Sequence, residues 1–175
     1  MQKHFNTTGP VFVNNHYCID PMQRLDWEDV LHLIDTEKYF VLHAPRQTGK
    51  TSTLLAMVDT LNKSGKYSAL YVNIEAAQAL RDDVEAGLKV VCETIASSAR
   101  IHAIEPRLEA LTDQMLNERH SGSVLMQQLS QWAQMSDKPV VLMLDEVDAL
   151  VGDTLLSVLR QIRGGYAQRP KAFPQ

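Results

Sequence analysis

The 175-residue chain has few of the residues that build disulfide frameworks or zinc sites. Its two cysteines, Cys18 and Cys92, lie far apart and form no C-x-x-C pair. Six histidines are scattered without the H-x-x-x-H or Cys–His spacing of a metal site. We therefore expect two free thiols that serve as small core residues in a reducing compartment, and no zinc site made by protein side chains.

Long hydrophobic runs are also missing. The best run, residues 140–144, falls far short of the ~20 apolar residues that a membrane-spanning helix requires. The first 15 residues contain no apolar stretch like that of a secretory signal. The sequence therefore predicts a cytoplasmic protein that does not bind to membranes through a spanning helix.

An excess of positive charge is absent as well. Lys and Arg total 17 against 21 Asp and Glu, which gives a net charge of −4. The overall field of such a chain does not attract nucleic acid or anionic lipid, although a local patch still could. The hydrophobic fraction of 45% and the charged fraction of 22% are typical of a globular protein of about one domain.

Short apolar runs alternate with helical patterns along the chain. Residues 38–43, 67–74 and 140–144 read as buried strands, because their apolar character is nearly continuous. Apolar residues at helical spacing predict six helices. Three of them are expected to begin at Asp26, Pro106 and Ser123, and the other three to span about 50–62, 77–99 and 153–163. Met115 and Trp132 are expected to lie in the core. The alternation predicts an α/β fold in three layers, with a mostly parallel sheet between two layers of helices.

One loop between a predicted strand and a predicted helix matches a phosphate-binding pattern. Its residues are Ala44, Pro45, Arg46, Gln47, Thr48, Gly49, Lys50 and Thr51. They fit G-x-x-x-x-G-K-[ST] except that Ala44 replaces the first glycine, a change that is tolerable if φ there stays negative.

Each part of this pattern has a physical reason. Backbone N–H groups of the loop surround an anionic phosphate, and the helix that follows adds the positive end of its dipole. Gly49 permits unusual dihedral angles and close approach, Lys50 reaches the β- and γ-phosphates, and Thr51 offers its hydroxyl to Mg²⁺. We therefore expect residues 44–51 to bind the phosphates of a nucleotide.

The run at 140–144 ends in a pair of carboxylates, Asp145 and Glu146. A buried strand that ends in Asp places a carboxylate at the carboxyl edge of the sheet, where it can hold the Mg²⁺ shell. The adjacent Glu146 can orient and deprotonate a water for attack on the γ-phosphate. The pair predicts a hydrolytic site with Thr51 and Asp145 on the metal and Glu146 as the catalytic residue.

Three further residues are weaker candidates. Glu75 follows the second predicted strand and would face the same edge, but a solvated loop position is the more favoured interpretation. Asp148 is favoured as the start of the next helix rather than as a support for the site. Arg46 is expected on the outside of the loop, with a nucleotide-sensing role as the minor alternative.

The segments HAPRQTGKT and VVLMLDEVDAL resemble the AAA-like ATPases of bacteria and archaea. These belong to the phosphate-loop (P-loop) NTPases that carry an extra catalytic glutamate, and the resemblance extends over nearly the whole chain. It implies Mg²⁺-dependent binding and hydrolysis of ATP, coupled to conformational switching. By the resemblance, Lys50 and Thr51 bind phosphate and Mg²⁺, Asp145 supports Mg²⁺, and Glu146 activates water.

The family pattern also predicts the domain organisation. Residues 1–37 are expected to form an N-terminal lead-in segment with one helix, and 38–175 the P-loop core. Such domains usually continue with a further apolar strand that ends in a polar sensor residue, whereas 164–175 contains no apolar run. We therefore expect a partial core, in which strands 38–43 and 140–144 either pair directly or leave backbone groups that another segment must cover.

Two other functions remain open at this point. The first is a nucleotide-dependent binding switch with negligible turnover, because no sensor or arginine finger can be assigned. The second is a small-molecule kinase, which Glu146 and the lack of an arginine-rich lid disfavour. The expected partners are the nucleotide and an unidentified protein, with oligomerisation left open and nucleic acid not supported by charge.

Overall fold

The computed structural model describes residues 3–6, 14–45, 47–118 and 122–175. The strands are β1 (Ser68–Asn73) and β2 (Val140–Asp145). The α-helices are α1 (Trp27–Asp35), α2 (Lys50–Ser64), α3 (Val84–Ile101), α4 (Arg107–Asn117), α5 (Val124–Met135) and α6 (Gly152–Gly164). Short 3-10 helices lie at Pro21–Arg24, Glu75–Leu80, Val147–Ala149 and Tyr166–Gln168.

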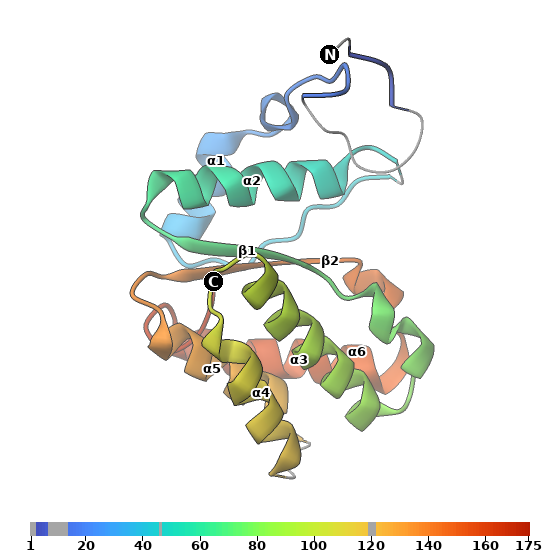
Figure 1. The fold of residues 1–175 in the computed structure, drawn as a ribbon, viewed down its shortest axis with the longest axis vertical. Coiled ribbons are helices and arrows are strands. Elements are labelled where there is room, and N and C mark those ends of the chain that lie inside the picture. The colour runs from blue at the N-terminus through green and yellow to red at the C-terminus, as the bar shows by residue number, and fades with distance from the viewer. Residues whose placement is uncertain (1–2, 7–13, 46, 119–121) are drawn as a thin grey trace.

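The two strands form a parallel sheet, with Ser68 opposite Val140 and Asn73 opposite Asp145. They are parallel because α3, α4 and α5 carry the chain back to the starting edge, as Figure 1 shows. Both strands therefore end at the same edge of the sheet. The runs predicted at 67–74 and 140–144 are confirmed as strands.

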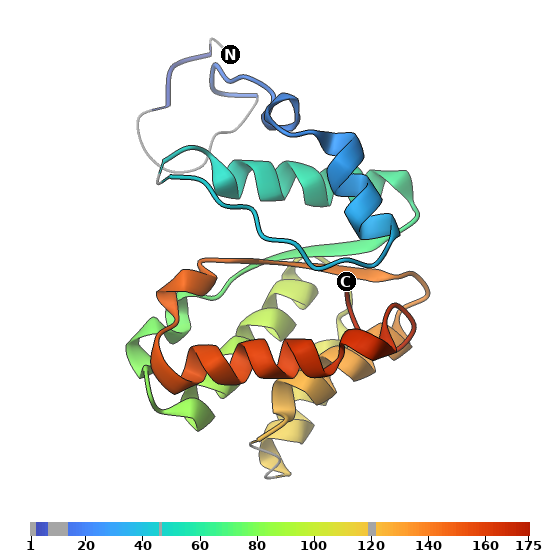
Figure 2. The same ribbon diagram turned by 180° about the vertical axis from the view of Figure 1, so that it is seen from behind.

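Helices cover both faces of this sheet. In Figures 1 and 2, α1 and α2 lie on one face and α3 to α6 on the other. Alternate strand residues supply the two cores: Ala69 and Met143 join the α1–α2 side, whereas Leu70 and Val72 join the other. The predicted layering of helices about a parallel sheet is therefore observed, with two strands in the described part of the chain.

Helix boundaries follow capping residues. Asp26 caps α1 by accepting a hydrogen bond from the Asp29 backbone N–H at 3.3 Å, as predicted. The helix expected from residue 77 begins later, because Asp83 caps α3 and residues 75–80 form a separate 3-10 helix. Met115 and Trp132 are buried in the core, as predicted.

The segment at 38–43 is not a strand, so this prediction is wrong. Its side chains alternate: Phe40 and Leu42 pack against the α1–α2 core, while Val41 is 88% exposed. Among the described residues it makes no backbone hydrogen bond to β2. An apolar run becomes a strand only where a neighbouring strand offers free N–H and C=O groups at bonding distance, and the segment finds none on β2 in the described part of the chain.

The far edge of β2 is partly covered by the end of the chain. The Gln175 N–H donates to the Val140 carbonyl at 2.8 Å, and the Gln175 carbonyl accepts from the Leu142 N–H at 3.0 Å. Phe173 is buried beside it, and the C label lies next to β2 in both views (Figures 1 and 2). Direct pairing of 38–43 with 140–144 therefore does not occur, and Gln175 occupies the beginning of that edge.

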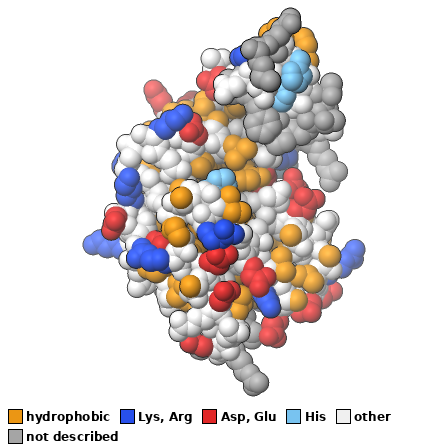
Figure 3. Space-filling model, viewed as in Figure 1, with side chains coloured by type: hydrophobic (Ala, Val, Ile, Leu, Met, Phe, Trp, Pro, Cys, Tyr) orange, Lys and Arg blue, Asp and Glu red, His pale blue; other side chains and the backbone are white. Residues whose placement is uncertain are grey.

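Charges of both signs are mixed over the face shown in Figure 3, where acidic and basic side chains are interspersed. No helix of the described residues combines the length and the apolar character needed to cross a membrane.

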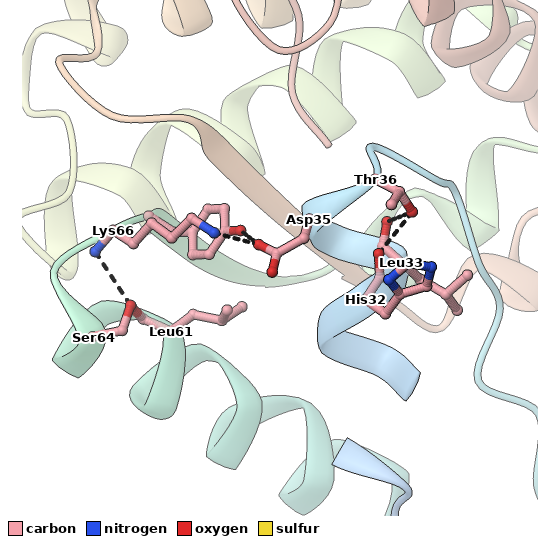
Figure 4. A network of polar contacts seen from close by, with 8 residues as sticks. His32, Leu33, Asp35, Thr36, Leu61, Ser64 and Lys66 are labelled. Carbon is pink, nitrogen blue, oxygen red and sulfur yellow. Dashed lines mark hydrogen bonds and ion pairs between the residues drawn. The ribbon is translucent and has the colours of Figure 1, made fainter. Parts of the chain in front are cut away.

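A polar network ties α1 to the start of β1 (Figure 4). Asp35, the last residue of α1, accepts hydrogen bonds from the Lys66 ammonium and from the Tyr67 hydroxyl. The hydrogen bond from Lys66, followed by that from Tyr67, lowers the pKa of the Asp35 carboxyl below its ordinary value. The network lies at the edge of the sheet where the strands begin.

Amide exchange should alternate along β2. The ladder directs the N–H groups of Val141, Met143 and Asp145 towards β1, whereas the Leu144 N–H faces the other edge, beyond Gln175. We predict that the Leu144 amide exchanges at least about tenfold faster than those of Met143 and Asp145, measured by NMR hydrogen exchange. Equal protection of Leu144 would show that a backbone acceptor covers this edge.

Candidate functional site

The described residues of the loop, 44–45 and 47–51, lie at the carboxyl edge of the sheet. It connects the extended segment before it to α2, and the first turn of α2 reaches the end of β2. Figure 1 shows the start of α2 and the end of β2 on the same side of the molecule. The chain therefore places the loop and the Asp145–Glu146 pair together, although they are almost a hundred residues apart in sequence.

Two described residues of the loop have a left-handed backbone conformation. Gln47 and Gly49 adopt positive φ angles of 59° and 86°, and Ala44 is not among the described residues with positive φ. Glycine suits position 49 because a residue with a side chain would be strained at that φ. Backbone N–H groups in such a turn, with the α2 N-terminus behind them, attract anions.

Lys50 bends back over the loop. Its ammonium donates to the carbonyl of Ala44 at 2.8 Å and, at 3.5 Å, lies at the limit of a hydrogen bond to that of Pro45. The Thr48 hydroxyl donates to the Pro45 carbonyl at 2.7 Å and closes the turn. The positive charge of Lys50 is therefore held against the first residues of the loop. Arg46, expected on the outside of the loop, lies outside the described residues.

Asp145 is the buried centre of the site, with an exposed fraction of 6%. Its Oδ2 accepts hydrogen bonds from the Thr51 hydroxyl at 2.7 Å and from the Tyr71 hydroxyl at 3.0 Å. Its Oδ1 accepts from the Glu146 backbone N–H at 3.0 Å. Burial of a carboxylate is costly without such donors, and these three come from α2, β1 and the turn after β2.

Glu146 occupies a left-handed backbone conformation, with φ 58° and ψ 34°. This conformation is uncommon for a residue with a side chain and is typical of functional turns. Within the described ranges, the Glu146 carboxylate has no hydrogen-bond or ion-pair partner, and the residue is half-buried. It is therefore free to interact with a molecule bound beside Asp145.

The weaker candidates do not join this cluster. Glu75 is exposed at the start of a 3-10 helix, with its backbone N–H bonded to the Asn73 side chain. Asp148 is exposed in the short helix at 147–149, ahead of α6. Glu75 thus lies on the surface, as the favoured interpretation has it, whereas Asp148 lies in a short 3-10 helix of its own and not at the start of α6.

Two residues of the cluster were not anticipated. Arg24 donates to the Thr48 carbonyl at 2.6 Å and so braces the loop from the N-terminal segment. Tyr71 bonds Asp145, and its phenol pKa is raised to about 12, first by burial and then by the negative charge of Asp145. The available signal for Tyr71 was an aromatic residue with a hydroxyl between Leu70 and Val72 of the predicted strand, whereas nothing in the sequence indicated Arg24.

The described residues form an α/β protein in which the start of α2 meets the buried aspartate at the end of a parallel strand. Comparison with known families matches residues 23–168 to the family described as an AAA-like domain. The match covers most of the chain, and the protein belongs to this family, which implies the P-loop fold and an NTPase-related function. Comparisons with curated proteins and with solved structures gave no match.

Proposed function

We propose that this AAA-like domain binds Mg·ATP at residues 44–51 and Asp145, and hydrolyses it with Glu146 as the general base. The observation that carries the proposal is the 2.7 Å hydrogen bond from the Thr51 hydroxyl to Asp145. It joins the end of the phosphate loop to the carboxylate at the end of β2, so that phosphate and metal ligands share one site.

Phosphate recognition rests on the loop. The N–H groups of a loop with positive φ at Gln47 and Gly49, together with the α2 N-terminus, form a concavity for an anion. To bind a phosphate, the Lys50 ammonium would leave the carbonyl oxygens of Ala44 and Pro45 and donate to phosphate oxygens instead. An ion pair with a phosphate is the stronger interaction, because both partners are charged.

The donor set at Asp145 fits a magnesium ion. Thr51 gives its hydroxyl hydrogen to Asp145, which leaves the oxygen lone pairs free for a cation. Mg²⁺ prefers oxygen ligands and is usually bound by one or two carboxylates together with substrate phosphates and water. When bound here, Mg²⁺ would neutralise charge on the β- and γ-phosphates. Thr51 would hold it directly, and Asp145 directly or through water.

Glu146 is proposed to act on the attacking water. Glu146 directly follows Asp145 in the chain and has a left-handed backbone conformation, a kind of strain that clusters at functional sites. A carboxylate so placed can orient a water and accept its proton during attack on the γ-phosphorus. This role favours transfer to water over transfer to an acceptor substrate, and so favours an ATPase over a small-molecule kinase.

Full ATP turnover would also depend on a catalytic arginine from outside the described residues of this chain. An arginine supplied by another subunit or protein can raise the rate of P-loop hydrolysis by ~10³ to 10⁵. We therefore propose that a protein partner or an oligomer completes the catalytic charge, and that hydrolysis drives a conformational change felt by that partner. The mixed charges of Figure 3 offer no support for a nucleic-acid partner.

Lys50→Ala should weaken ATP binding by about 100-fold, because a hydrogen-bonded charge on the phosphates is lost. Titration of a fluorescent ATP analogue measures this change. Lys63→Ala is the matched control, since Lys63 lies on the same helix, exposed and paired with Asp59 at 2.6 Å. Unchanged affinity in Lys50→Ala would contradict the phosphate role of the loop.

Glu146→Gln should slow phosphate release by at least about 100-fold while ATP binding persists, since a general base contributes ~10² to 10⁴ in rate. A phosphate-release assay under saturating Mg·ATP checks it, with Asp148→Asn as the control for loss of an exposed carboxylate nearby. If wild type and Glu146→Gln release phosphate at the same background rate, turnover by this chain alone is refuted, and a nucleotide-binding switch is the function that remains for it.

A further inference from the structure

We propose that Tyr71 is a positioning residue for the Mg²⁺ half of this site, acting through Asp145. The proposal rests on the proposed function, because it concerns how the same carboxylate is held for the metal. Its basis is that the Tyr71 hydroxyl and the Thr51 hydroxyl donate to the same oxygen, Oδ2 of Asp145.

The strand register explains why these groups meet. Tyr71 pairs with Met143 across the sheet, and Asp145 is two residues further along β2 on the same face. Diagonal neighbours on one face of a sheet are within reach of a long aromatic side chain. The tyrosine thus spans from β1 to the end of β2, and its ring packs against the α1–α2 core.

Three donors then fix the carboxylate. Thr51 and Tyr71 hold Oδ2 at 2.7 and 3.0 Å, and the Glu146 N–H holds Oδ1 at 3.0 Å. Two bonds on one oxygen and one on the other leave the group little freedom to rotate about its Cβ–Cγ bond. The orientation of Asp145 in turn fixes the direction of the Thr51 hydroxyl hydrogen, and therefore of the lone pairs that a cation would use.

The contribution of Tyr71 to this arrangement is its hydroxyl, which donates to Oδ2 of Asp145 at 3.0 Å. A phenylalanine would fill the same space in the α1–α2 core and remove the hydroxyl that donates to Asp145. The carboxylate would then be held on Oδ2 by Thr51 alone and could turn away from the metal position.

A second tyrosine provides a matched control for a purely structural role. Tyr67 precedes β1 and donates its hydroxyl to Asp35, so that it makes a tyrosine–aspartate bond at the opposite end of the same strand. Tyr67→Phe and Tyr71→Phe therefore remove the same kind of contact. Only Tyr71 touches the proposed metal site.

The test is a titration of ATP affinity against Mg²⁺ concentration for the wild type, Tyr71→Phe and Tyr67→Phe. We expect Tyr71→Phe to raise the Mg²⁺ concentration for half-maximal effect about five- to tenfold, which is less than the full loss of a hydrogen bond to a charged group, because Tyr71 acts on the metal only through Asp145. The change in affinity without Mg²⁺ should be smaller than this. Tyr67→Phe should shift the Mg²⁺ midpoint by less than about twofold.

The outcomes separate the two proposals. A wild type whose nucleotide binding shows no Mg²⁺ dependence overturns the proposed function, and this inference with it. A Mg²⁺-dependent wild type with an unshifted midpoint in Tyr71→Phe overturns the role of Tyr71 alone.

Thermal unfolding of Tyr71→Phe in wild-type and Asp145→Ala backgrounds gives an independent measurement. If Tyr71 acts through Asp145, the second background should show a clearly smaller loss of Tm, because the partner is already gone. Equal losses in both backgrounds would contradict the inference.

Discussion

The hydrogen bond between the Thr51 hydroxyl and the buried Asp145 carboxylate is the contact on which the site depends. A carboxylate that is 6% exposed is costly to bury unless donors replace the water that it loses. Those donors come from α2, from β1 and from the turn after β2, so the carboxylate is satisfied only when all three elements are in place. The hydrogen bonds that stabilise the buried carboxylate therefore also bring the loop, the end of β2 and Glu146 together in one site.

The packing around the sheet holds the strand ends in the positions that these hydrogen bonds require. Parallel pairing of β1 and β2 puts both strand ends at one edge, and two hydrophobic cores hold the strands between α1–α2 and α3–α6. Arg24 and the Asp35–Lys66–Tyr67 network then fix the N-terminal part of the chain, the first at the loop and the second at the opposite edge of the sheet. Membership of the AAA-like family agrees with this arrangement and implies an NTPase-related function.

Patterns in the sequence predicted correctly those elements whose structure depends on neighbouring residues or on burial alone. The continuous apolar runs at 67–74 and 140–144 are strands, and the spacing of the loop and of Asp145–Glu146 indicated which residues would meet at the sheet edge. The run at 38–43 has the same apolar character but is not a strand, because hydrogen bonding depends on a neighbour's free edge, which no local pattern records. The contacts of Tyr71 and Arg24 were not predicted for a related reason, because they arise from strand register and chain folding rather than from neighbours in sequence.

The central claim is that the loop and β2 form a single site for nucleotide and metal, joined by Thr51. The most direct test is calorimetric titration of ATP, with and without Mg²⁺, into the wild type and Thr51→Val, which keeps the shape of the side chain and loses its hydroxyl. The account predicts that Mg²⁺ tightens ATP binding to the wild type by about tenfold or more and changes binding to Thr51→Val by less than about twofold. The same Mg²⁺ enhancement in both proteins would contradict it.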